Sequence, residues 1–262
     1  MRECWAAVLG DCRGKITGEH YVSQAAFITE RITVEGFAWC KDAPKVIGLA
    51  SATANVLCEH HNSKLSELDA AAGQAIQVLR DSVALDKSRR RLKVWEVPKH
   101  ERFTIDAARV ERWMLKTLLN LVHGPGIAAR HGVPAGGMAS LEQAELCYGL
   151  RPFSGHAGMH FAAHEGLTFS LQDALSFRPA ISDGVIVGAW VEFHGLRFIL
   201  NLDAARRPDT YLQIHGSPRW GETVLKKPLE HIYFKRLSYP SHTLDFDWWS
   251  CPHMSGHGLF AM

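Results

Sequence analysis

The sequence lacks any apolar run long enough to cross a bilayer. Its longer runs, such as Val185 to Val191, fall far short of the ~20 residues that a spanning helix needs. The start of the chain also lacks the charged and then apolar pattern of a secretory signal, and no internal repeat is present. These absences argue against membrane-spanning, secreted and repeat proteins, and we expect a cytoplasmic protein that engages no membrane.

The chain also lacks a large surplus of either charge. Its 29 Lys and Arg residues stand against 27 Asp and Glu, which gives a formal net charge of +2. The whole molecule is therefore not an obvious polyanion binder, and any surface for nucleic acid must be a local patch. A hydrophobic fraction of 47% excludes the low-hydrophobicity profile of disordered chains, so this chain is expected to fold.

The length of 262 residues exceeds the usual ~100–150 residues of one domain. Residues 1–82 are rich in Cys, Gly and His and predict a small metal-supported module. Residues 83–150 carry helical patterns and predict a helical connector, whereas residues 151–262 carry strand patterns. We therefore expect an α+β protein whose C-terminal part is a β-rich domain of sandwich or barrel type.

The local patterns predict individual elements. Apolar residues recur at helical spacing over 63–80 and over 105–122, and Ser140 with Gln143 three residues later is typical of a capped helix over 140–147. Strand patterns cover 158–163, 167–171, 185–193, 196–202 and 211–215. Between the third and fourth of these, His194 and Gly195 predict a tight β-hairpin turn.

The cysteines and histidines indicate a metal site, because a cytosolic chain keeps its thiols reduced. Two residues separate Cys58 from His61, a spacing that lets one turn present two ligands to tetrahedral zinc. Cys4 and Cys12 can supply the other two ligands, which gives a closed Cys3His structural site. His60 is the competing ligand, but the two-residue gap favours His61.

Glu19, His20 and Asn62 form a second set of harder donors, interleaved with the zinc ligands. Oxygen ligands suit Mg²⁺-like ions, whereas thiolates select zinc, so two different metal sites are chemically reasonable. The order of these short segments resembles the HNH endonuclease family. That family has a ββα-metal core with an acidic residue and a histidine on its first strand, followed by a zinc knuckle and an Asn or His where the helix begins.

The resemblance covers roughly the first 80 residues and implies a role for each matching position. His20 would be the general base that deprotonates water for attack on phosphorus, while Glu19 and Asn62 would hold a catalytic Mg²⁺ or Mn²⁺ ion. Asn55 would be the central asparagine that orients the histidine. The chain departs from the family in pairing Cys4 with Cys12 instead of using Cys-x-x-Cys, and in placing His61 where a cysteine is commoner.

The implied activity is metal-dependent hydrolysis of phosphodiester bonds, with DNA as the expected partner. A basic stretch that contains Arg89, Arg90, Arg91 and Lys93 is a candidate phosphate-binding surface, although such stretches are more often simply solvated. The alternative is a non-catalytic zinc-containing protein that binds nucleic acid or another protein. Isolated dipeptide matches arise by chance, but three matches in the right order make chance a poorer explanation. The presence of both His20 and Asn62 favours the enzyme.

Overall fold

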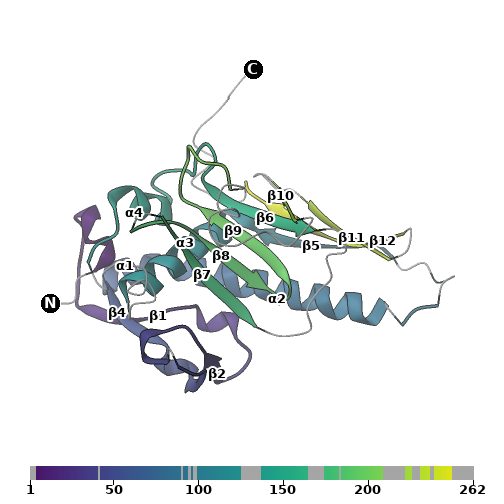
Figure 1. Ribbon diagram of the computed structural model, residues 1–262, viewed down its shortest axis with the longest axis horizontal. Helices are drawn as coiled ribbons and strands as arrows, with labels where there is room; N and C mark the ends of the chain where they lie inside the picture. The colour runs from purple at the N-terminus through teal and green to yellow at the C-terminus, as the bar shows by residue number, and fades with distance from the viewer. Residues whose placement is uncertain are drawn as a thin grey trace.

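The fold was obtained as a computed structural model, which describes residues 4–40, 42–89, 91–93, 96, 99–124, 137–164, 174–182, 184–208, 222–225, 231–236 and 239–249. Helices and strands are mixed along this part of the chain, so the expected α+β class is confirmed (Figure 1). Within the same residues, no helix combines the length and the apolar character needed to cross a membrane.

The N-terminal part consists of two small antiparallel ribbons, several short 3-10 helices labelled η, and two consecutive α-helices. These elements are η1 (Trp5–Leu9), β1 (Ile16–His20), η2 (Gln24–Ala26), β2 (Arg31–Val34), η3 (Ala38–Cys40), β3 (Lys45–Gly48), η4 (Leu49–Ser51), β4 (Thr53–Cys58), α1 (Glu59–Lys64) and α2 (Ser66–Arg89). β1 pairs with β4, and β2 pairs with β3, so the second ribbon is an insertion within the first. α1 follows β4 directly, which gives a ββα order at the N-terminus.

The middle of the chain contains β5 (Glu101–Asp106), α3 (Ala107–His123) and α4 (Leu141–Cys147). The predicted helices are present here, and the capping box at the start of α4 has both of its hydrogen bonds, between Ser140 and Gln143. β5 was not predicted from the sequence. It pairs in parallel with the last strand that the structure describes, so its partner lies more than a hundred residues away.

The C-terminal part is rich in strands, as expected. These are β6 (Gly158–His164), β7 (Leu175–Ser182), β8 (Val185–Phe193), β9 (Leu196–Asn201), β10 (Glu222–Leu225), β11 (His231–Arg236) and β12 (Tyr239–Asp247). Five of them form a sheet in the order β10-β6-β9-β8-β7. The other two, β11 and β12, form a three-stranded sheet with β5, in the order β11-β12-β5. The predicted hairpin joins β8 to β9, with positive φ angles at His194 and Gly195 as a tight turn requires. The expected strands over 167–171 and 211–215 lie outside the described residues.

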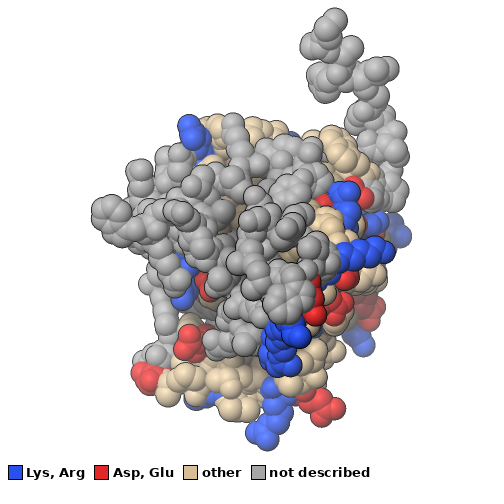
Figure 2. Space-filling model, turned by 90° about the vertical axis from the view of Figure 1, so that its right-hand side faces the viewer, with Lys and Arg blue, Asp and Glu red and all other residues tan. Residues whose placement is uncertain are grey.

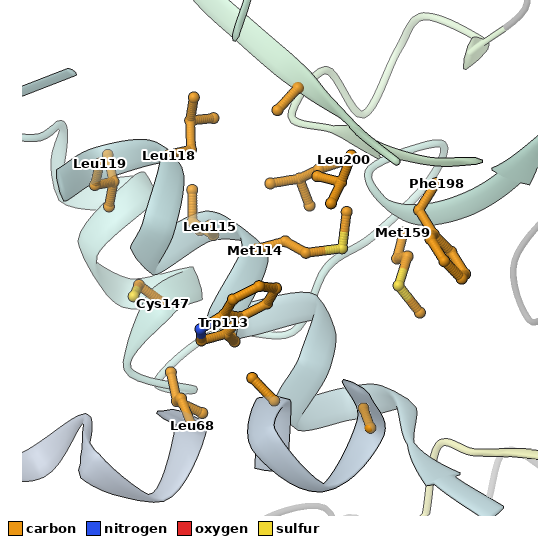
Figure 3. Packing of buried hydrophobic residues seen from close by; sticks show 14 of the residues in the cluster. Leu68, Trp113, Met114, Leu115, Leu118, Leu119, Cys147, Met159, Phe198 and Leu200 are labelled. Atoms are coloured by element: carbon orange, nitrogen blue, oxygen red, sulfur yellow. The ribbon is translucent and has the colours of Figure 1, made fainter. Parts of the chain in front are cut away.

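One hydrophobic core joins all three expected regions around α3. Leu115, Leu118 and Leu119 of this helix are fully buried, and the cluster continues to Leu68 of α2 and to Leu200 of β9 (Figure 3). The apolar face of the five-stranded sheet therefore packs against helices α2 and α3. This differs from the expected sandwich or barrel, because helices supply the second layer where a sandwich would have a second sheet.

Candidate functional site

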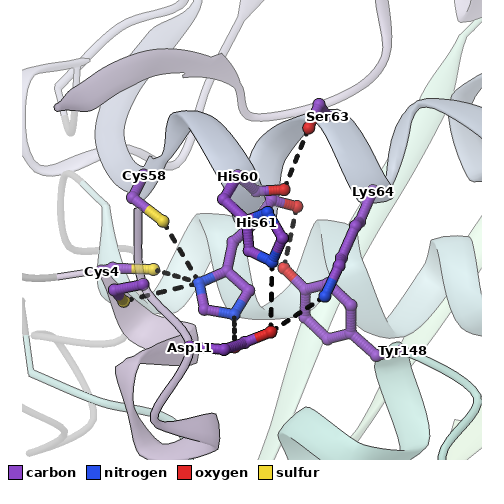
Figure 4. Close-up of polar contacts among 9 residues, drawn as sticks. Cys4, Asp11, Cys58, His60, His61, Ser63, Lys64 and Tyr148 are labelled. Carbon is purple, nitrogen blue, oxygen red and sulfur yellow. Dashed lines mark hydrogen bonds and ion pairs between the residues drawn. The ribbon is translucent and has the colours of Figure 1, made fainter. Parts of the chain in front are cut away.

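Four side chains from three short segments converge at the base of the β1–β4 ribbon. The Sγ atoms of Cys4, Cys12 and Cys58 lie 3.3, 3.5 and 3.3 Å from Nδ1 of His61 (Figure 4). All four donor atoms lie within 4.8 Å of one another. Cys4, Cys58 and His61 are buried, whereas Cys12 is exposed.

This geometry fits a tetrahedral metal ion such as zinc. With Zn–S near 2.3 Å and Zn–N near 2.0–2.1 Å, a tetrahedral ion separates sulfur from nitrogen by about 3.5 Å. The three sulfur-to-nitrogen distances are close to that value. Three soft sulfur donors and one imidazole are the ligand type that selects zinc over magnesium. The predicted group of Cys4, Cys12, Cys58 and His61 can therefore hold a metal ion.

Local structure explains how each donor is placed. Cys4 precedes η1, which ends at Gly10, and Cys12 lies in the turn between η1 and β1. Gly10 and Gly14 have φ angles of +79° and +76°, which only glycine adopts freely, so they bend the chain on either side of Cys12. Cys58 ends β4, and His61 lies almost one turn into α1, so one strand-to-helix junction presents both donors.

Asp11 orients the histidine donor. Its Oδ1 lies 2.7 Å from Nε2 of His61, so a metal on Nδ1 and a carboxylate on Nε2 would fix one tautomer and one ring orientation. The other carboxylate oxygen accepts hydrogen bonds from Lys64 and His60, at 2.9 and 3.1 Å. Tyr148, which directly follows α4, donates its hydroxyl to the His61 carbonyl at 2.9 Å. The expectation that His60 is not a ligand agrees with its place beside Asp11.

The electrostatics around the donors favour binding of a cation. Burial raises the pKa of the Cys4 thiol. Burial acts in the same direction on Cys58, but backbone N–H groups of His61 and Arg13 stabilise its thiolate and lower the net pKa. Lys64, with His60 and His61, keeps the pKa of Asp11 below its usual range. A bound divalent cation would supply the charge that three neighbouring thiolates need.

Glu19, expected to ligate a catalytic ion, is instead held in a buried ion cluster. Its Oε1 lies 2.5 Å from Nζ of Lys116 on α3, and Nζ also lies 2.6 Å from Oδ2 of Asp69 on α2. Burial would lower the pKa of Lys116, but the two carboxylates raise it, and burial raises the pKa of Glu19. One ammonium serves two carboxylates, so the three groups carry a formal charge of −1 when all are ionised.

His20 lies on the opposite face of β1 from Glu19, because consecutive strand residues alternate. His20 pairs with Thr53 and Gly18 pairs with Asn55 across the ribbon. We call the face that carries these four residues the outer face of the ribbon. Gly18 and Asn55 are exposed there and His20 is half-buried, so this face is open to a large substrate.

The expected asparagine and metal roles are only partly matched. Asn62 donates to Thr17 Oγ1 at 3.1 Å, on the face that Glu19 shares and His20 does not. Glu19 and Asn62 therefore do not form a ligand pair for Mg²⁺ or Mn²⁺ in this structure. Asn55 does not make the contact expected of it either, because the asparagine that binds the His20 backbone is Asn120 of α3, at 3.2 Å.

Arg89, expected to contact nucleic acid, is instead held by groups within the fold. Its side chain is buried, and its guanidinium is 2.8 Å from Glu101 Oε1 and donates to the backbone carbonyls of Ser241 and Lys99. Arg89 therefore fastens the end of α2 to the three-stranded sheet. Arg90 lies outside the described residues.

Arg91 and Lys93 are exposed, and their contact with nucleic acid stays a prediction. The end of α2 points toward the side of the molecule that Figure 2 displays. Among the described residues on that face, basic and acidic side chains lie intermixed. Mixed charge of this kind gives a weaker field for phosphates than a continuous basic patch would.

Sequence reasoning missed Asp11, Lys116 and Asn120. Asp11 directly precedes a proposed zinc ligand, and carboxylates commonly orient metal-bound histidines, so this position was recognisable. Lys116 and Asn120 lie four residues apart on one helical face, in the mostly apolar stretch of α3 from Trp113 to Val122. Polar residues at that spacing on a buried face are a usable signal, but only the fold identifies β1 as their partner.

Comparison with known proteins gives no family for this chain. No family model matches it, and no curated protein and no solved structure matches it either. The function therefore has to be argued from the site itself.

Proposed function

We propose that this chain is an HNH-type endonuclease that hydrolyses phosphodiester bonds, with DNA as its substrate, on a ribbon braced by a structural zinc ion. Cys4, Cys12, Cys58 and His61 would hold the zinc. The observation that carries the proposal is the position of His20. It lies on the open outer face of a two-stranded ribbon whose other end is fixed by the metal-binding cluster.

The zinc would act structurally. Four protein donors fill a tetrahedral coordination shell and leave no position for substrate or water, which is the arrangement of a structural site. Binding would tie η1, the turn before β1, and the β4–α1 junction into one unit. The ribbon is only two strands wide, and such a ribbon is marginally stable alone, so this bracing explains how it can hold a reactive side chain in place.

His20 would act as the general base. A neutral imidazole accepts a proton from water, the hydroxide oxygen attacks phosphorus, and the P–O ester bond breaks, with the leaving oxygen taking a proton from solvent. Nδ1 of His20 is buried without a hydrogen-bond partner among the described residues, so Nε2 would be the nitrogen that accepts the proton. The outer face is flat and exposed at Gly18, which leaves room for a polymer backbone beside the ring.

A catalytic divalent ion is not assigned to residues here. Glu19 forms an ion pair with Lys116, and Asn62 donates a hydrogen bond to Thr17. The two side chains are therefore not arranged to bind one metal ion together. We therefore derive no step through Mg²⁺ or Mn²⁺. The metal requirement is left to experiment, with each ion titrated separately.

The buried state of Glu19 also favours a second candidate, a zinc-containing protein that binds nucleic acid without cleaving it. In that case the ββα unit would be a rigid binding scaffold, and the Glu19–Lys116 pair would be purely structural. The two candidates share the zinc centre and differ in whether His20 is needed for a chemical step.

A plasmid-nicking assay separates the candidates. Zinc-loaded protein is incubated with supercoiled DNA and with Mg²⁺ or Mn²⁺, and His20→Ala is compared with His100→Ala. His100 is exposed, lies outside the ribbon and bonds to Thr243, so its loss controls for removal of an imidazole. General-base catalysis contributes about 10²- to 10⁴-fold, so His20→Ala should lose at least about 100-fold and His100→Ala should match wild type.

Each alternative outcome is informative. Equal cleavage by wild type and His20→Ala would show that His20 is not the base. If wild-type protein cuts no DNA with either ion but retards duplex DNA in a gel only when zinc is bound, the binding scaffold is the correct function. Neither cleavage nor retardation of DNA or RNA would overturn both candidates.

A further inference from the structure

Helix α3 holds the end of β1 at two successive residues. Lys116 binds the Glu19 side chain, and Asn120, one turn later on the same helical face, donates from Nδ2 to the His20 carbonyl at 3.2 Å. Asn120 is 1% exposed, and its Oδ1 accepts a hydrogen bond from the Trp5 indole at 3.0 Å. Its amide is therefore fully buried and engaged at both ends.

The buried ring nitrogen of His20 lacks an orienting hydrogen bond within the part of the chain that the structure describes. In most sites with a working histidine, a carboxylate or carbonyl on the second ring nitrogen sets its orientation. Here Nδ1 of His20 has no hydrogen-bond partner among the described residues. The orientation of the ring then depends on the backbone of His20, and the one side chain bonded to that backbone carbonyl is Asn120.

Asn120 also connects the His20 backbone to the metal-binding cluster. Its second contact, Trp5, is fully buried and follows the donor Cys4 directly. The Trp5 carbonyl accepts a hydrogen bond from the backbone N–H of Ala139. The centroid of the Trp5 ring lies 6.0 Å from that of the Tyr148 ring, and the Tyr148 hydroxyl donates to the His61 carbonyl. A buried polar network of this kind is rigid when every member is satisfied.

From these contacts we infer that Asn120 is a positioning residue for His20, acting through the backbone carbonyl at the end of β1. The inference deepens the proposed function, since it rests on His20 being the base. It assigns to α3, about a hundred residues further along the chain than His20, a role that the ββα segment does not fulfil by itself. Asn120 touches neither substrate nor the reacting atoms, so its effect is on the placement of the base.

The isosteric variant Asn120→Asp tests this inference. It keeps an oxygen acceptor for Trp5 but removes the N–H that reaches His20. Asn201→Asp is the matched control, because Asn201 is also fully buried and donates from Nδ2 to two backbone carbonyls, those of His156 and Arg206. Both variants bury one new carboxyl group, so both lose stability for the same reason.

We expect Asn120→Asp to lower kcat about 10- to 100-fold with KM changed less than about twofold, because a small displacement of a catalytic group has effects of that size. Asn201→Asp should keep the wild-type kcat per folded, zinc-loaded molecule. The pH profile adds a second readout. Burial raises the pKa of a carboxyl group, so acid pH restores an O–H donor at position 120, and the deficit in kcat should shrink as pH falls.

Nuclear magnetic resonance of ring-labelled His20 gives a readout that needs no activity. The imidazole signals should shift or broaden in Asn120→Asp and stay unchanged in Asn201→Asp. If wild type does not cleave, the proposed function fails, yet this spectrum still decides whether Asn120 positions the ring. If Asn120→Asp does not fold at neutral pH, the uncharged variant Asn120→Ala takes its place. Wild-type spectra and kinetics in the position-120 variant would overturn the inference.

Discussion

The buried ion cluster on α3 allows one prediction to be worked out in detail. Lys116→Met keeps an unbranched side chain of similar length but removes the ammonium that Glu19 and Asp69 share. The side chains of Lys116 and Glu19 are 2% and 8% exposed, so water cannot replace the partner that Glu19 loses. Breaking a buried pair on one side costs about 3–5 kcal/mol of unfolding free energy, and we expect a loss in that range.

A double-mutant cycle isolates the cause. Adding Glu19→Gln to Lys116→Met removes both charges, so the double variant should be more stable than Lys116→Met alone. Lys15→Met is the control, because Lys15 is 81% exposed and its oxygen partner on Glu59 lies 3.9 Å away. An exposed pair of this kind contributes ~0–1 kcal/mol, so the control should lie close to wild type.

The pH dependence has a definite sign. Without Lys116, the pKa of Glu19 in the folded state rises further above its unfolded value, since burial then acts unopposed. A carboxyl group with a raised folded pKa favours the folded state at low pH and loses that contribution as pH rises. The deficit of Lys116→Met should therefore be larger at pH 7 than at pH 5.

The assay is urea unfolding followed by tryptophan fluorescence and circular dichroism on zinc-loaded protein, at both pH values. A loss under about 1 kcal/mol at pH 7, together with no coupling between the two positions, would refute the reasoning. It would mean that the two carboxylates reach solvent once Lys116 is removed.

The remaining predictions concern the metal centre, a buried histidine and the basic stretch. Asp11→Asn should weaken zinc affinity about 10- to 100-fold, measured by chelator competition. His242 is fully buried and burial lowers its pKa from 6.5 to about 4, so its neutral form contributes stability above pH 6.5 that is lost as pH falls through about 4. That loss is roughly 3 kcal/mol between pH 7 and pH 4 in wild type, and it should be smaller in His242→Gln. Arg89→Met should cost ~1–3 kcal/mol of stability and leave DNA affinity per folded molecule unchanged, whereas Lys93→Ala should weaken any DNA binding most at low salt.

Each of these expectations has a clear opposite. Unchanged zinc affinity in Asp11→Asn would show that the carboxylate does not orient His61. Parallel pH profiles for wild type and His242→Gln would show that His242 titrates normally. Weaker DNA binding by folded Arg89→Met would mean that the buried guanidinium influences the binding surface after all.

Several features of the fold were predictable because they depend on residues close together in the sequence. The Ser140–Gln143 capping box spans four residues, and the β8–β9 hairpin is specified by alternation on either side of His194 and Gly195. The pairing of Cys58 with His61 is of the same kind, because a two-residue gap at a helix start brings both donors to one side. These features are determined almost entirely by residues that are neighbours in the sequence.

Other features were not predictable because they depend on contacts between distant segments. β5 pairs with β12, and its own residues give no signal that names such a partner. Arg89 belongs to a basic stretch of the sequence, but in the fold Glu101 and Ser241 contact its guanidinium. The sequence does not show whether a charged side chain is solvated or buried, because that depends on which distant segments pack against it.

The candidate site also contains both kinds of feature, those predictable from nearby residues and those that depend on distant contacts. By itself the sequence singled out four donors that can hold a metal ion, because ligand type and spacing are local properties. The resemblance to the HNH family, also drawn from the sequence, implied that His20 lies on a strand. The tertiary structure alone decided that Glu19 faces Lys116 and that Asn120 holds the His20 backbone. The physical reason is that the charge and orientation of a polar group depend on what packs against it, and here that is a helix folded back from about a hundred residues away.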